Sequence, residues 1–435
     1  MKILKENGIF AFICSNKFAK AKYGEKLRKL ILENQLKIYD DFTGVKIFNE
    51  AQVDTCVIQI KKNFNPENMI LVNNEYNMQQ NKLDFKSFIF NSPEVLNLRD
   101  KIINQGTMIK DLDITIKRGI LTGFNKAFII DESTKNKLIK LDSKNKEIIK
   151  PLLRGRDVNK WRISYKNLYI IFTRRGIDIN KYPVIKEFLS KYKKELTPKT
   201  KDSKRTDVGR KPGPYEWYEI QDNVAYYSLF EEEKLIYPEL SSSLSMVYDN
   251  NQFYIDKTCF IITTSLNIKY INALLNSNVL NFVFKLLGTP LGKSGFNLSK
   301  IYIERLPIKI TNTSTEKEIN ELVDEIIVLN NEINNEIINF KKYLKEQNIN
   351  PVSNKLEDYY SLDSKKFINE IKKQHKVLLS DTLINELIHK FQNSIRNISN
   401  LNSDLKVKEY KLNNIIYKIY NLNENEIKLI EDDLI

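Results

Sequence analysis

Residues 9–14, IFAFIC, form an apolar run of the kind that is buried in a sheet, and the run arrives almost at once in the chain. A loop follows, and then a helix is expected near Tyr23–Asn34, whose apolar face would be formed by Tyr23, Leu27, Leu30 and Ile31. The later stretch VDTCVIQI, residues 53–60, is typical of a strand buried on both faces. This alternation predicts half of a layered α/β domain, entered at its middle rather than at its beginning.

Three further segments differ in composition. Residues 63–104 are polar and rich in Asn, with Pro66 and Pro93 as breakers, and are expected to be a linker or crossover. Residues 105–310 alternate short β-like runs with Gly, Pro and Asn, with one helix expected near 268–287, which predicts a mixed, mostly-β domain. Residues 311–435 are expected to be a helical C-terminal region. The predicted domains are therefore 1–62, 105–310 and 311–435.

The helical region carries a heptad pattern. Position a would be taken by Val323, Asn330, Ile337 and Leu344, and position d by Ile319, Ile326, Ile333 and Phe340. A buried Asn330 would fix the register of a coiled coil, whereas an amphipathic helix that lies on its own domain produces the same pattern. Residues 410–432 are expected to form two short amphipathic helices around a turn at 421–423.

Cysteine and histidine usage narrows the class of protein. The three cysteines, Cys14, Cys56 and Cys259, show no CxxC spacing, which favours a reducing, cytoplasmic location and argues against a disulfide framework or a metal site. The two histidines, His375 and His389, lie in the polar helical region, so histidine-based catalysis is not expected. No apolar run approaches about 20 residues, so no membrane span is predicted.

The positive charge is concentrated in one segment. The chain carries a formal net charge of +14, and residues 150–211 contain 19 Lys or Arg against 6 Asp or Glu, a net charge of +13. A localised basic block beside aromatic-rich sequence predicts a polyanionic partner, with nucleic acid ahead of a membrane surface because the block has no amphipathic helical face.

Familiar catalytic patterns are missing. The sequence contains no Walker A, GxSxG, HExxH or EF-hand pattern, and no catalytic residue is predicted. The stretches FNPEN and NSPEV place Asn near Pro, but neither is an Asn/Asp-Pro-Pro-Tyr loop.

Several stretches, in order along the chain, resemble one family. ENGIFAFICSNKFAKAKYGEKLRKLILEN and VKIFNEAQVDTCVIQIKK resemble the later half of the catalytic domain of adenine-specific DNA methyltransferases, and more narrowly the TaqI-like class of restriction–modification enzymes. IKRGILTGFNKAFIID, IIKPLLRGRDVNKW, WYEIQ, KLIYPELSSSLSMVYDNNQFYIDKTCFII and GTPLGKSGFNLSKIYIERLPI are similar to that family's target-recognition domain, and NNIIYKIYNLNENEIKLIED to its helical ending. The resemblance implies a partial, Rossmann-like α/β methyltransferase segment, then a mostly-β target-recognition domain and a helical region.

The resemblance also implies an activity and its partners. Such enzymes transfer a methyl group from S-adenosylmethionine to the exocyclic amine of a flipped adenine in double-stranded DNA. Their glycine-rich donor loop and Asn-Pro-Pro-Tyr loop normally precede the segment seen here, and neither is present. A separate polypeptide is therefore expected to supply the N-terminal half of the methyltransferase, unless the gene is a truncated remnant. The alternative function is a standalone DNA specificity subunit without catalysis.

Three candidate residues belong to the methyltransferase segment. In the family an aromatic residue at the position of Phe48 stacks on the flipped adenine; the alternative is a core residue at the start of a strand. Asn16 and Lys17 follow the carboxyl end of the first strand, where ligands of open α/β sheets bind, so they are expected to line the channel for the base or the backbone. An ordinary strand-to-helix turn explains both residues equally well.

The remaining candidates are expected to contact DNA, where phosphate contacts provide affinity and base contacts provide specificity. They are Arg154, Arg156, Lys160, Arg174, Arg175, Lys204, Arg205, Arg210, Lys211, Lys293 and Ser294. Residues 199–217 are expected to form a mobile basic loop. The structural alternatives are an ion pair between Arg154 and Asp157, a solvated charge run around 204–211, and, for Lys293 and Ser294, a tight connection between the helix and the last strand.

Overall fold

The computed structural model describes residues 1–48, 53–200, 202–204, 206–288, 295–349, 354–375 and 380–432. The chain divides into two compact units. Unit 1 comprises Met1–Lys160, Tyr165–Thr311 and Ile416–Ile435, and unit 2 comprises Trp161–Ser164 and Asn312–Ile415. Three of the predicted candidates, Arg205, Lys293 and Ser294, lie outside the described residues.

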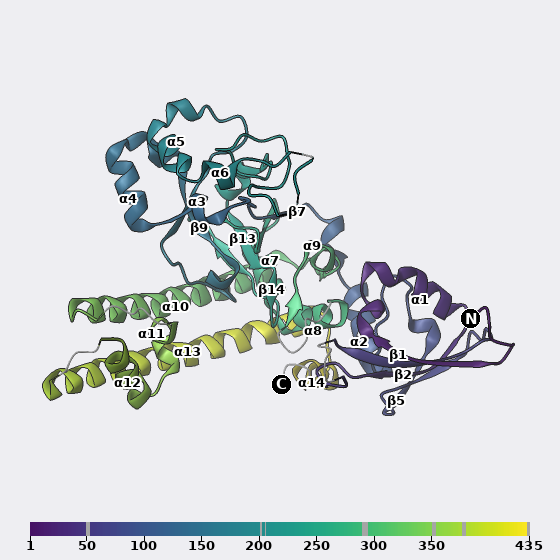
Figure 1. The fold of residues 1–435 in the computed structure, drawn as a ribbon. Helices are drawn as coiled ribbons and strands as arrows, with labels where there is room; N and C mark the ends of the chain where they lie inside the picture. Colours follow the sequence, from purple (N-terminus) through teal and green to yellow (C-terminus); the bar gives the residue numbers. More distant parts are fainter. Residues whose placement is uncertain are drawn as a thin grey trace. The chain divides into compact units, whose positions relative to one another are not determined.

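Unit 1 begins with a five-stranded sheet (Figure 1). Its strands are β1 (Ile9–Ser15), β2 (Gln35–Asp41), β3 (Thr55–Lys61), β4 (Met69–Val72) and β5 (Tyr76–Gln79), in the order β1-β3-β2-β4-β5. Because β3 pairs antiparallel with both β1 and β2, the latter two run in the same direction and end at the same edge of the sheet. The segments η1 (Asn16–Ala19), η2 (Lys22–Gly24) and α1 (Glu25–Leu32) connect β1 to β2.

Helix α1 buries a different face from the one its apolar pattern predicts. Ile31 is buried as expected, but Tyr23, Leu27 and Leu30 are exposed. The guanidinium of Arg28 is buried instead, and it donates hydrogen bonds to the carbonyls of Phe18, Ala21, Phe85 and Lys86. Because Arg28 occupies the buried side of the helix and bonds to four carbonyls there, the apolar side chains lie on the side that is exposed.

Residues 63–104 are folded, which corrects the predicted linker. They contain β4, β5, η3 (Gln80–Lys82) and α2 (Pro93–Asn104). Their polar side chains serve the backbone: Gln80 accepts from the Leu36 amide and donates to the Asn34 carbonyl, and Asn68 donates to the Leu36 carbonyl. The polar composition that suggested a linker therefore reflects buried amides that close the hydrogen bonds of the sheet.

The middle of unit 1 contains two four-stranded sheets. The first has the order β15-β13-β17-β7 and comprises β7 (Ile114–Arg118), β13 (Lys234–Pro238), β15 (Val247–Asp249) and β17 (Cys259–Thr264). The second has the order β16-β9-β12-β8 and comprises β8 (Ile129–Asp131), β9 (Ile149–Leu153), β12 (Leu168–Ile171) and β16 (Tyr254–Ile255). Two short pairs join β6 (Thr107–Met108) to β19 (Pro307–Ile308) and β14 (Leu240–Ser241) to β18 (Phe296–Asn297).

Several helices surround these sheets. They are α3 (Asn125–Phe128), α4 (Glu132–Leu141), α5 (Pro183–Ser190), α6 (Lys193–Leu196), α7 (Ile268–Leu275), α8 (Asn278–Leu287) and α9 (Lys300–Ile303). The single helix expected near 268–287 is two helices, because Ser277 caps the start of α8 by accepting from the Leu280 amide. Both are almost entirely buried.

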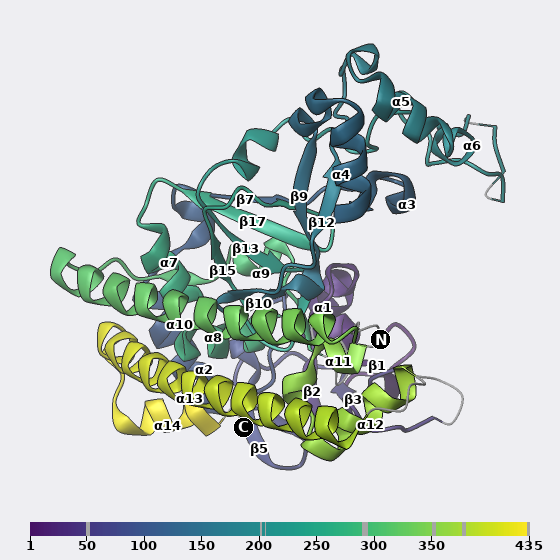
Figure 2. The ribbon, with the colours of Figure 1, turned by 90° about the vertical axis from the view of Figure 1, so that its left-hand side faces the viewer.

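Unit 2 is helical. It is built from α10 (Thr313–Glu346), α11 (Asn354–Glu357), α12 (Ser364–His375) and most of α13 (Asp381–Ile419), and Figure 2 shows α10 and α13 running side by side. The two long helices are antiparallel, since Glu325 pairs with Lys408 while Tyr343 bonds to Glu386. Asn330 is buried but donates to the Ile326 carbonyl of its own helix, so it does not bridge two helices.

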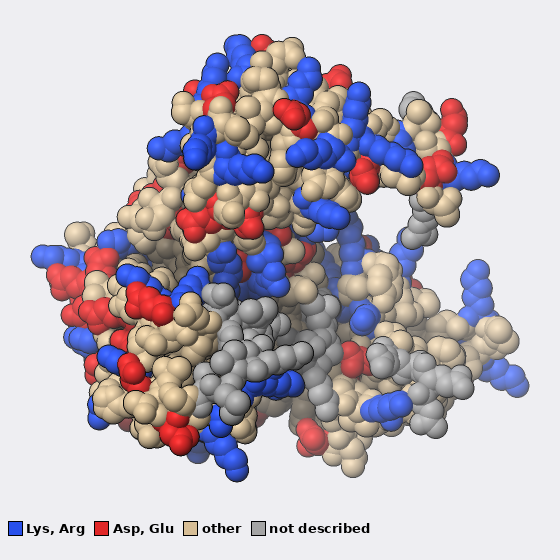
Figure 3. Space-filling model, turned by 60° about the vertical axis from the view of Figure 1, so that its left-hand side comes forward, with Lys and Arg blue, Asp and Glu red and all other residues tan. Residues whose placement is uncertain are grey.

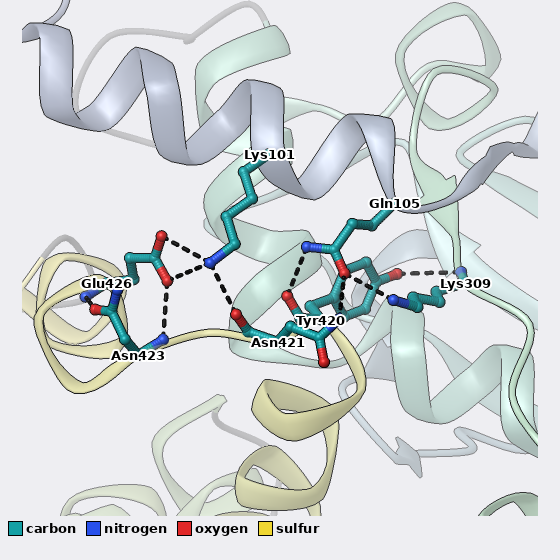
Figure 4. Close-up of polar contacts among 7 residues, drawn as sticks. All are labelled: Lys101, Gln105, Lys309, Tyr420, Asn421, Asn423 and Glu426. Atoms are coloured by element: carbon teal, nitrogen blue, oxygen red, sulfur yellow. Dashed lines mark hydrogen bonds and ion pairs between the residues drawn. The ribbon is translucent and has the colours of Figure 1, made fainter.

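The C-terminal residues return to unit 1, whereas the sequence predicts one helical region over 311–435. Residues 410–419 continue the long helix α13, so only α14 (Glu424–Asp432) is the short helix expected there. Lys101 on α2 binds the carboxylate of Glu426 at 2.7 Å and the Asn421 carbonyl at 2.8 Å (Figure 4). The Tyr420 hydroxyl donates to the Pro307 carbonyl at 2.7 Å and is fully buried. These contacts fix residues 416–432 against α2 and β19.

Candidate nucleic-acid interface

A cavity of about 550 Å³ opens where β1 and β2 end and β3 begins. One side is formed by residues of the first sheet and the segments beside it, including Asn16, Lys17, Tyr39, Asp41 and Asp54. The other side is formed by Ser242, Lys285, Leu286 and Phe296 from the middle of unit 1. The carboxyl ends of neighbouring strands are where open α/β sheets bind ligands, and the volume lies in the range of small-molecule sites.

A hydrogen-bond network orders the polar side of this cavity. The Asn16 side chain donates to Asp41 Oδ1 at 3.0 Å and to the Thr43 hydroxyl at 2.6 Å. Asp41 Oδ1 also accepts from the Thr43 amide at 2.9 Å, and Asp54 accepts from the Gly44 amide at 3.1 Å. The structure thus places Asn16 and Lys17 at the cavity, and it adds two carboxylates that the sequence analysis did not single out.

Aromatic rings form part of the cavity wall. Tyr39 and Phe90 stack with their ring centroids 3.6 Å apart and their planes at 12°. Burial and the neighbouring Asp41 carboxylate raise the pKa of Tyr39, so its hydroxyl stays protonated. Phe296 lies on the opposite side and packs edge-on against Phe284. Flat apolar surfaces beside fixed carboxylates suit a planar ligand that carries hydrogen-bond donors.

Lys20 joins the two sides of the cavity. Its ammonium donates to the carbonyls of Leu286 at 3.0 Å and Gly288 at 2.9 Å, at the carboxyl end of α8. Burial lowers the pKa of Lys20 to about 8, although the Asp41 carboxylate acts in the opposite direction. The contact holds the end of α8 beside η1.

Phe48 lies in the loop that follows β2, and its side chain is 44% exposed. It belongs to neither β2 nor β3, so the alternative of a buried residue at the start of a strand does not describe it. Val45 and Ile47 in the same loop are exposed as well. The described part of this loop starts after Asp41, which lines the cavity, and it presents these three apolar side chains to solvent.

The predicted DNA contacts fall into two groups. Arg154, Arg156 and Lys160 follow the carboxyl end of β9, and Arg174 and Arg175 follow the carboxyl end of β12. Because β9 and β12 are antiparallel, the two groups lie at opposite ends of the sheet, on the order of 16 Å apart.

The first group, at the carboxyl end of β9, is connected to the cavity through backbone and side-chain hydrogen bonds. The Gly155 amide donates to the Thr258 hydroxyl at 2.8 Å, and the Thr258 carbonyl accepts from the Glu239 amide. Glu239 directly precedes β14, and the cavity residue Ser242 directly follows it. Arg118, which the sequence analysis did not single out, pairs there with Glu239 at 2.7 Å. Arg156 is exposed, whereas Arg154 pairs with the buried carboxylate of Asp157 at 3.5 Å. The Arg154–Asp157 alternative is therefore present in the structure.

The second group gathers residues from β12 and the basic loop. Arg174 is exposed and lies over the Tyr227 ring, with its guanidinium 5.0 Å from the centroid. Arg175 donates to the Gln221 carbonyl at 2.9 Å. Lys204 and Lys211 are exposed. On the face in Figure 3, Lys and Arg outnumber Asp and Glu over the upper part of unit 1.

Arg210 has a structural role, which withdraws it from the candidate DNA contacts. Its side chain is 3% exposed, and its guanidinium donates to the carbonyls of Leu196, Thr122, Glu219, Glu216 and Trp217. It also lies 4.5 Å from the centroid of the Tyr215 ring. Arg210 organises the basic loop from within, and no donor remains for a phosphate.

The rule already applied to Asn16 could have found Asp41, one of the cavity residues that were missed. The stretch IYDDFTG also ends a strand with polar residues, and it contains Asp41 and Thr43. Lys20, Phe90 and Arg118 carry no comparable signal, because only the folded chain brings them to this region. Within the described residues, no group of three or more His, Cys, Asp or Glu side chains is arranged to hold a metal, and no helix has the length and hydropathy of a membrane span.

Three family models match the chain. Residues 150–308 match the TaqI-like C-terminal specificity domain, and residues 1–48 match the Eco57I restriction-modification methylase. Residues 312–416, which nearly coincide with unit 2, match a family described only as a domain of unknown function.

Two curated proteins are similar over most of the chain. The type II methyltransferase M.BstVI of Geobacillus stearothermophilus is 24% identical over 404 residues, which cover 82% of this chain and 68% of that protein. The type II restriction enzyme and methyltransferase RM.Eco57I of Escherichia coli is 24% identical over 339 residues, which cover 66% of this chain and 33% of that protein.

Two solved structures are also similar. The type IIL restriction-modification enzyme MmeI in complex with DNA has a TM-score of 0.47 at 15% identity, covering 90% of this chain and 50% of that one. The type IIG restriction endonuclease BpuSI has a TM-score of 0.36 at 12% identity, covering 91% of this chain and 47% of that one. The chain thus spans about half the length of these two enzymes.

Proposed function

The chain corresponds to a C-terminal portion of the type II restriction–modification methyltransferases, and on that premise we propose that it reads a specific sequence in duplex DNA and holds the extruded target adenine. The observation that carries the proposal is the cavity at the ends of β1 and β2, which lies between the methylase-like segment and the segment that matches the specificity domain. Reading and base extrusion would then meet at one place.

The cavity residues suit an extruded adenine. Removing a base from the duplex costs a few kcal/mol, roughly, in lost stacking and pairing. Stacking on an aromatic side chain returns about 1–3 kcal/mol per base, and Phe48 is an exposed aromatic residue in the loop that follows the cavity residue Asp41. The carboxylates of Asp41 and Asp54 accept hydrogen bonds, which suits an exocyclic amine. Asn16 and Lys17 line the same cavity, where they would orient the base and its phosphate.

The exposed cations would position the duplex. Arg156 and Arg174 are exposed and flank opposite ends of one sheet, so together they could contact phosphates along the DNA. Lys160, Arg175, Lys204 and Lys211 remain candidates of the same kind, and Arg118 joins them. Such contacts provide affinity and fix the register, while base-edge contacts provide the specificity.

The turn between β1 and α1 does not have the character of a glycine-rich loop that binds S-adenosylmethionine. The turn between β1 and α1 contains a single glycine, Gly24, and a Cβ there would lie 2.2 Å from the Phe18 carbonyl oxygen. That glycine is needed for internal packing rather than for the close approach of a cofactor. On this proposal the methyl donor, and the chemistry it supplies, would be bound by the polypeptide that carries the N-terminal half of the methyltransferase.

A standalone specificity subunit is the second candidate, and the single, internally packed glycine of the turn between β1 and α1 favours it. The two candidates differ in one assay: the purified chain, the protein encoded immediately upstream, duplex DNA and S-adenosylmethionine labelled on its methyl group are combined. Transfer of label to adenine only when both proteins are present supports the methyltransferase. DNA binding without transfer supports the specificity subunit, and absence of DNA binding by either mixture contradicts both.

A further inference from the structure

A groove runs between the two long helices of unit 2, which Figure 2 draws side by side. It consists of two hollows, of about 500 Å³ and about 400 Å³, that follow one another along the helix pair. The residues that line it fall between 324 and 339 on α10 and between 397 and 408 on α13, and on each helix they recur at the spacing of a single face. At 1.5 Å per residue the groove is on the order of 23 Å long, which is about four helical turns.

The groove lies on a side of the helix pair that is open within the described part of unit 2. Ile333, Phe340 and Leu344 of α10 enter a core that they share with α11, α12 and α13. These core positions lie about a third of a turn around α10 from the residues that line the groove. Helices α11 and α12 therefore pack on another face of α10 and leave the groove accessible.

One end of the groove is apolar. Val328 and Val407 line it from opposite helices and are 54% and 65% exposed, and Leu329 beside them is half-buried. Tyr410 follows Val407 by one helical turn and is 66% exposed. Single exposed apolar residues are common on protein surfaces, but a group of them around a hollow is typical of a surface that binds a partner.

The groove is acidic along most of its length. Its lining includes five carboxylates and a single ammonium, that of Lys408, which pairs with Glu325 at 2.7 Å. The five carboxylates are those of Asp324, Glu325, Glu332, Glu336 and Asp404. The whole chain carries a net charge of +14, so this negative charge is a local feature. It disfavours DNA, an anionic membrane and the same groove of a second copy as occupants, since each of them is also negative.

We propose that this groove docks a cationic amphipathic helix of a partner protein. The apolar residues of that helix would pack on Val328, Leu329 and Val407, and its Lys or Arg residues would face the carboxylates of the groove. A helix fits better than a strand, because the walls are helices whose backbone groups are already bonded and offer no sheet edge. The inference goes beyond DNA recognition, since it gives unit 2 a protein partner of its own.

The probe is a synthetic helix of about 16 residues, with Leu at positions spaced i, i+3, i+4 and i+7 and with Lys and Arg elsewhere. It carries a fluorescent label, and its binding to the full chain is followed by anisotropy. A peptide with Glu in place of Lys and Arg should not bind. A scrambled peptide of the cationic composition, which has no apolar face, should bind at least about tenfold more weakly.

Charge variants locate the contact in the groove. Glu332→Gln with Asp404→Asn neutralises two exposed carboxylates of the lining and should weaken binding of the cationic helix by at least about fivefold. The matched control, Glu346→Gln with Asp381→Asn, neutralises two exposed carboxylates of the same helices outside the groove. It should leave the affinity within about twofold of wild type.

Apolar variants test the other half of the recognition. Val328→Ser with Val407→Ser keeps every charge and removes the apolar end of the groove, so binding should weaken by at least about fivefold. Ile338→Ser is the control, because Ile338 is 61% exposed on α10 and does not line the groove.

Three results would overturn the proposal. They are equal binding of the cationic, acidic and scrambled peptides, no binding of the cationic helix up to about 1 mM, and equal affinities of the groove variants and their controls. DNA binding by the same variants is measured in parallel and should match wild type, so that a failed groove leaves the proposed recognition of DNA untouched.

Discussion

Asn16 and Asp41 meet at 3.0 Å across the carboxyl ends of two parallel strands, with the antiparallel strand β3 between those strands. The side-chain amide of Asn16 and the backbone amide of Thr43 both donate to Oδ1 of Asp41. The rotamers of Asn16 and Asp41 are therefore set before any ligand arrives. The polar side of the cavity is therefore preorganised, which lowers the entropic cost of holding a base there.

Phe48 should matter for methylation more than for DNA binding. In the enzyme reconstituted with its partner, Phe48→Ala removes the stacking surface, worth about 1–3 kcal/mol, from the extruded base and leaves phosphate contacts unchanged. We expect the methylation rate to fall about 5- to 100-fold, with a change in duplex affinity below about threefold. Phe48→Trp keeps an aromatic face and should retain most activity. Equal loss of methylation and DNA binding in Phe48→Ala would point to a folding role.

Arg156 is the clearest test of phosphate contact in the specificity segment, because it is exposed. Arg156→Met should reduce the slope of log affinity against log salt by about 0.9, and adding Arg154→Met should reduce it no further, because Arg154 is paired with Asp157. The control, Lys342→Met with Lys366→Met, removes the same charge from exposed positions of unit 2. If the slope of the double Arg variant matches that of the control, both arginines are structural.

Arg210 should be required for folding. Arg210→Met leaves five carbonyl groups without their donor, and we expect the free energy of unfolding to fall by at least about 3 kcal/mol. Arg210→Lys should restore little, since an ammonium cannot reproduce the planar array of donors. The neighbouring exposed Lys211→Met is the matched control, expected to unfold within about 0.5 kcal/mol of wild type. A stable Arg210→Met protein in chemical denaturation would refute the structural assignment.

Lys20 should make stability depend on pH in an alkaline window. Its pKa is lowered from 10.5 to about 8 by burial, so between these values the folded chain binds fewer protons at this site than the unfolded chain. Stability therefore rises with pH from about 8 toward 10.5, as the penalty for a buried charge is relieved. Relative to Lys20→Met, wild type should gain stability over that window in thermal unfolding. Lys26→Met, on the exposed side of α1, should run parallel to wild type; parallel curves for Lys20→Met would contradict a buried charge.

The sequence predicted strands well where burial and apolar runs coincide. β1 and β3 coincide closely with the apolar runs 9–14 and 53–60 that were predicted as strands. The sequence-based interpretation was wrong where polar side chains are buried and hydrogen-bonded to the backbone. Gln80 and Asn68 read as linker residues but complete the hydrogen bonds of a sheet, and Arg210 read as a DNA contact but is buried among carbonyls. Periodicity cannot distinguish these cases, because it records where a residue lies in a pattern and not which groups need a donor.

The candidate site was predicted in part. Asn16 and Lys17 were found from the end of a strand, and the structure places both at the cavity. Its opposite wall comes from residues 242–296, far away in sequence, and no local pattern indicates that Lys20 reaches the end of α8. The apolar face of α1 was recognised in the sequence, but its exposure became visible only in the fold, where Arg28 takes the buried position.

The central claim is that the chain reads a specific DNA sequence. It is tested most directly when the purified chain selects duplexes from a randomised pool at about 150 mM salt, because at that ionic strength non-specific phosphate contacts alone bind weakly. The account predicts that repeated rounds enrich one short motif. It also predicts that the motif is lost when the residues that read it are replaced, while residual binding remains. Recovery of duplexes with no shared sequence would contradict a sequence-specific reader, whatever the affinity for DNA.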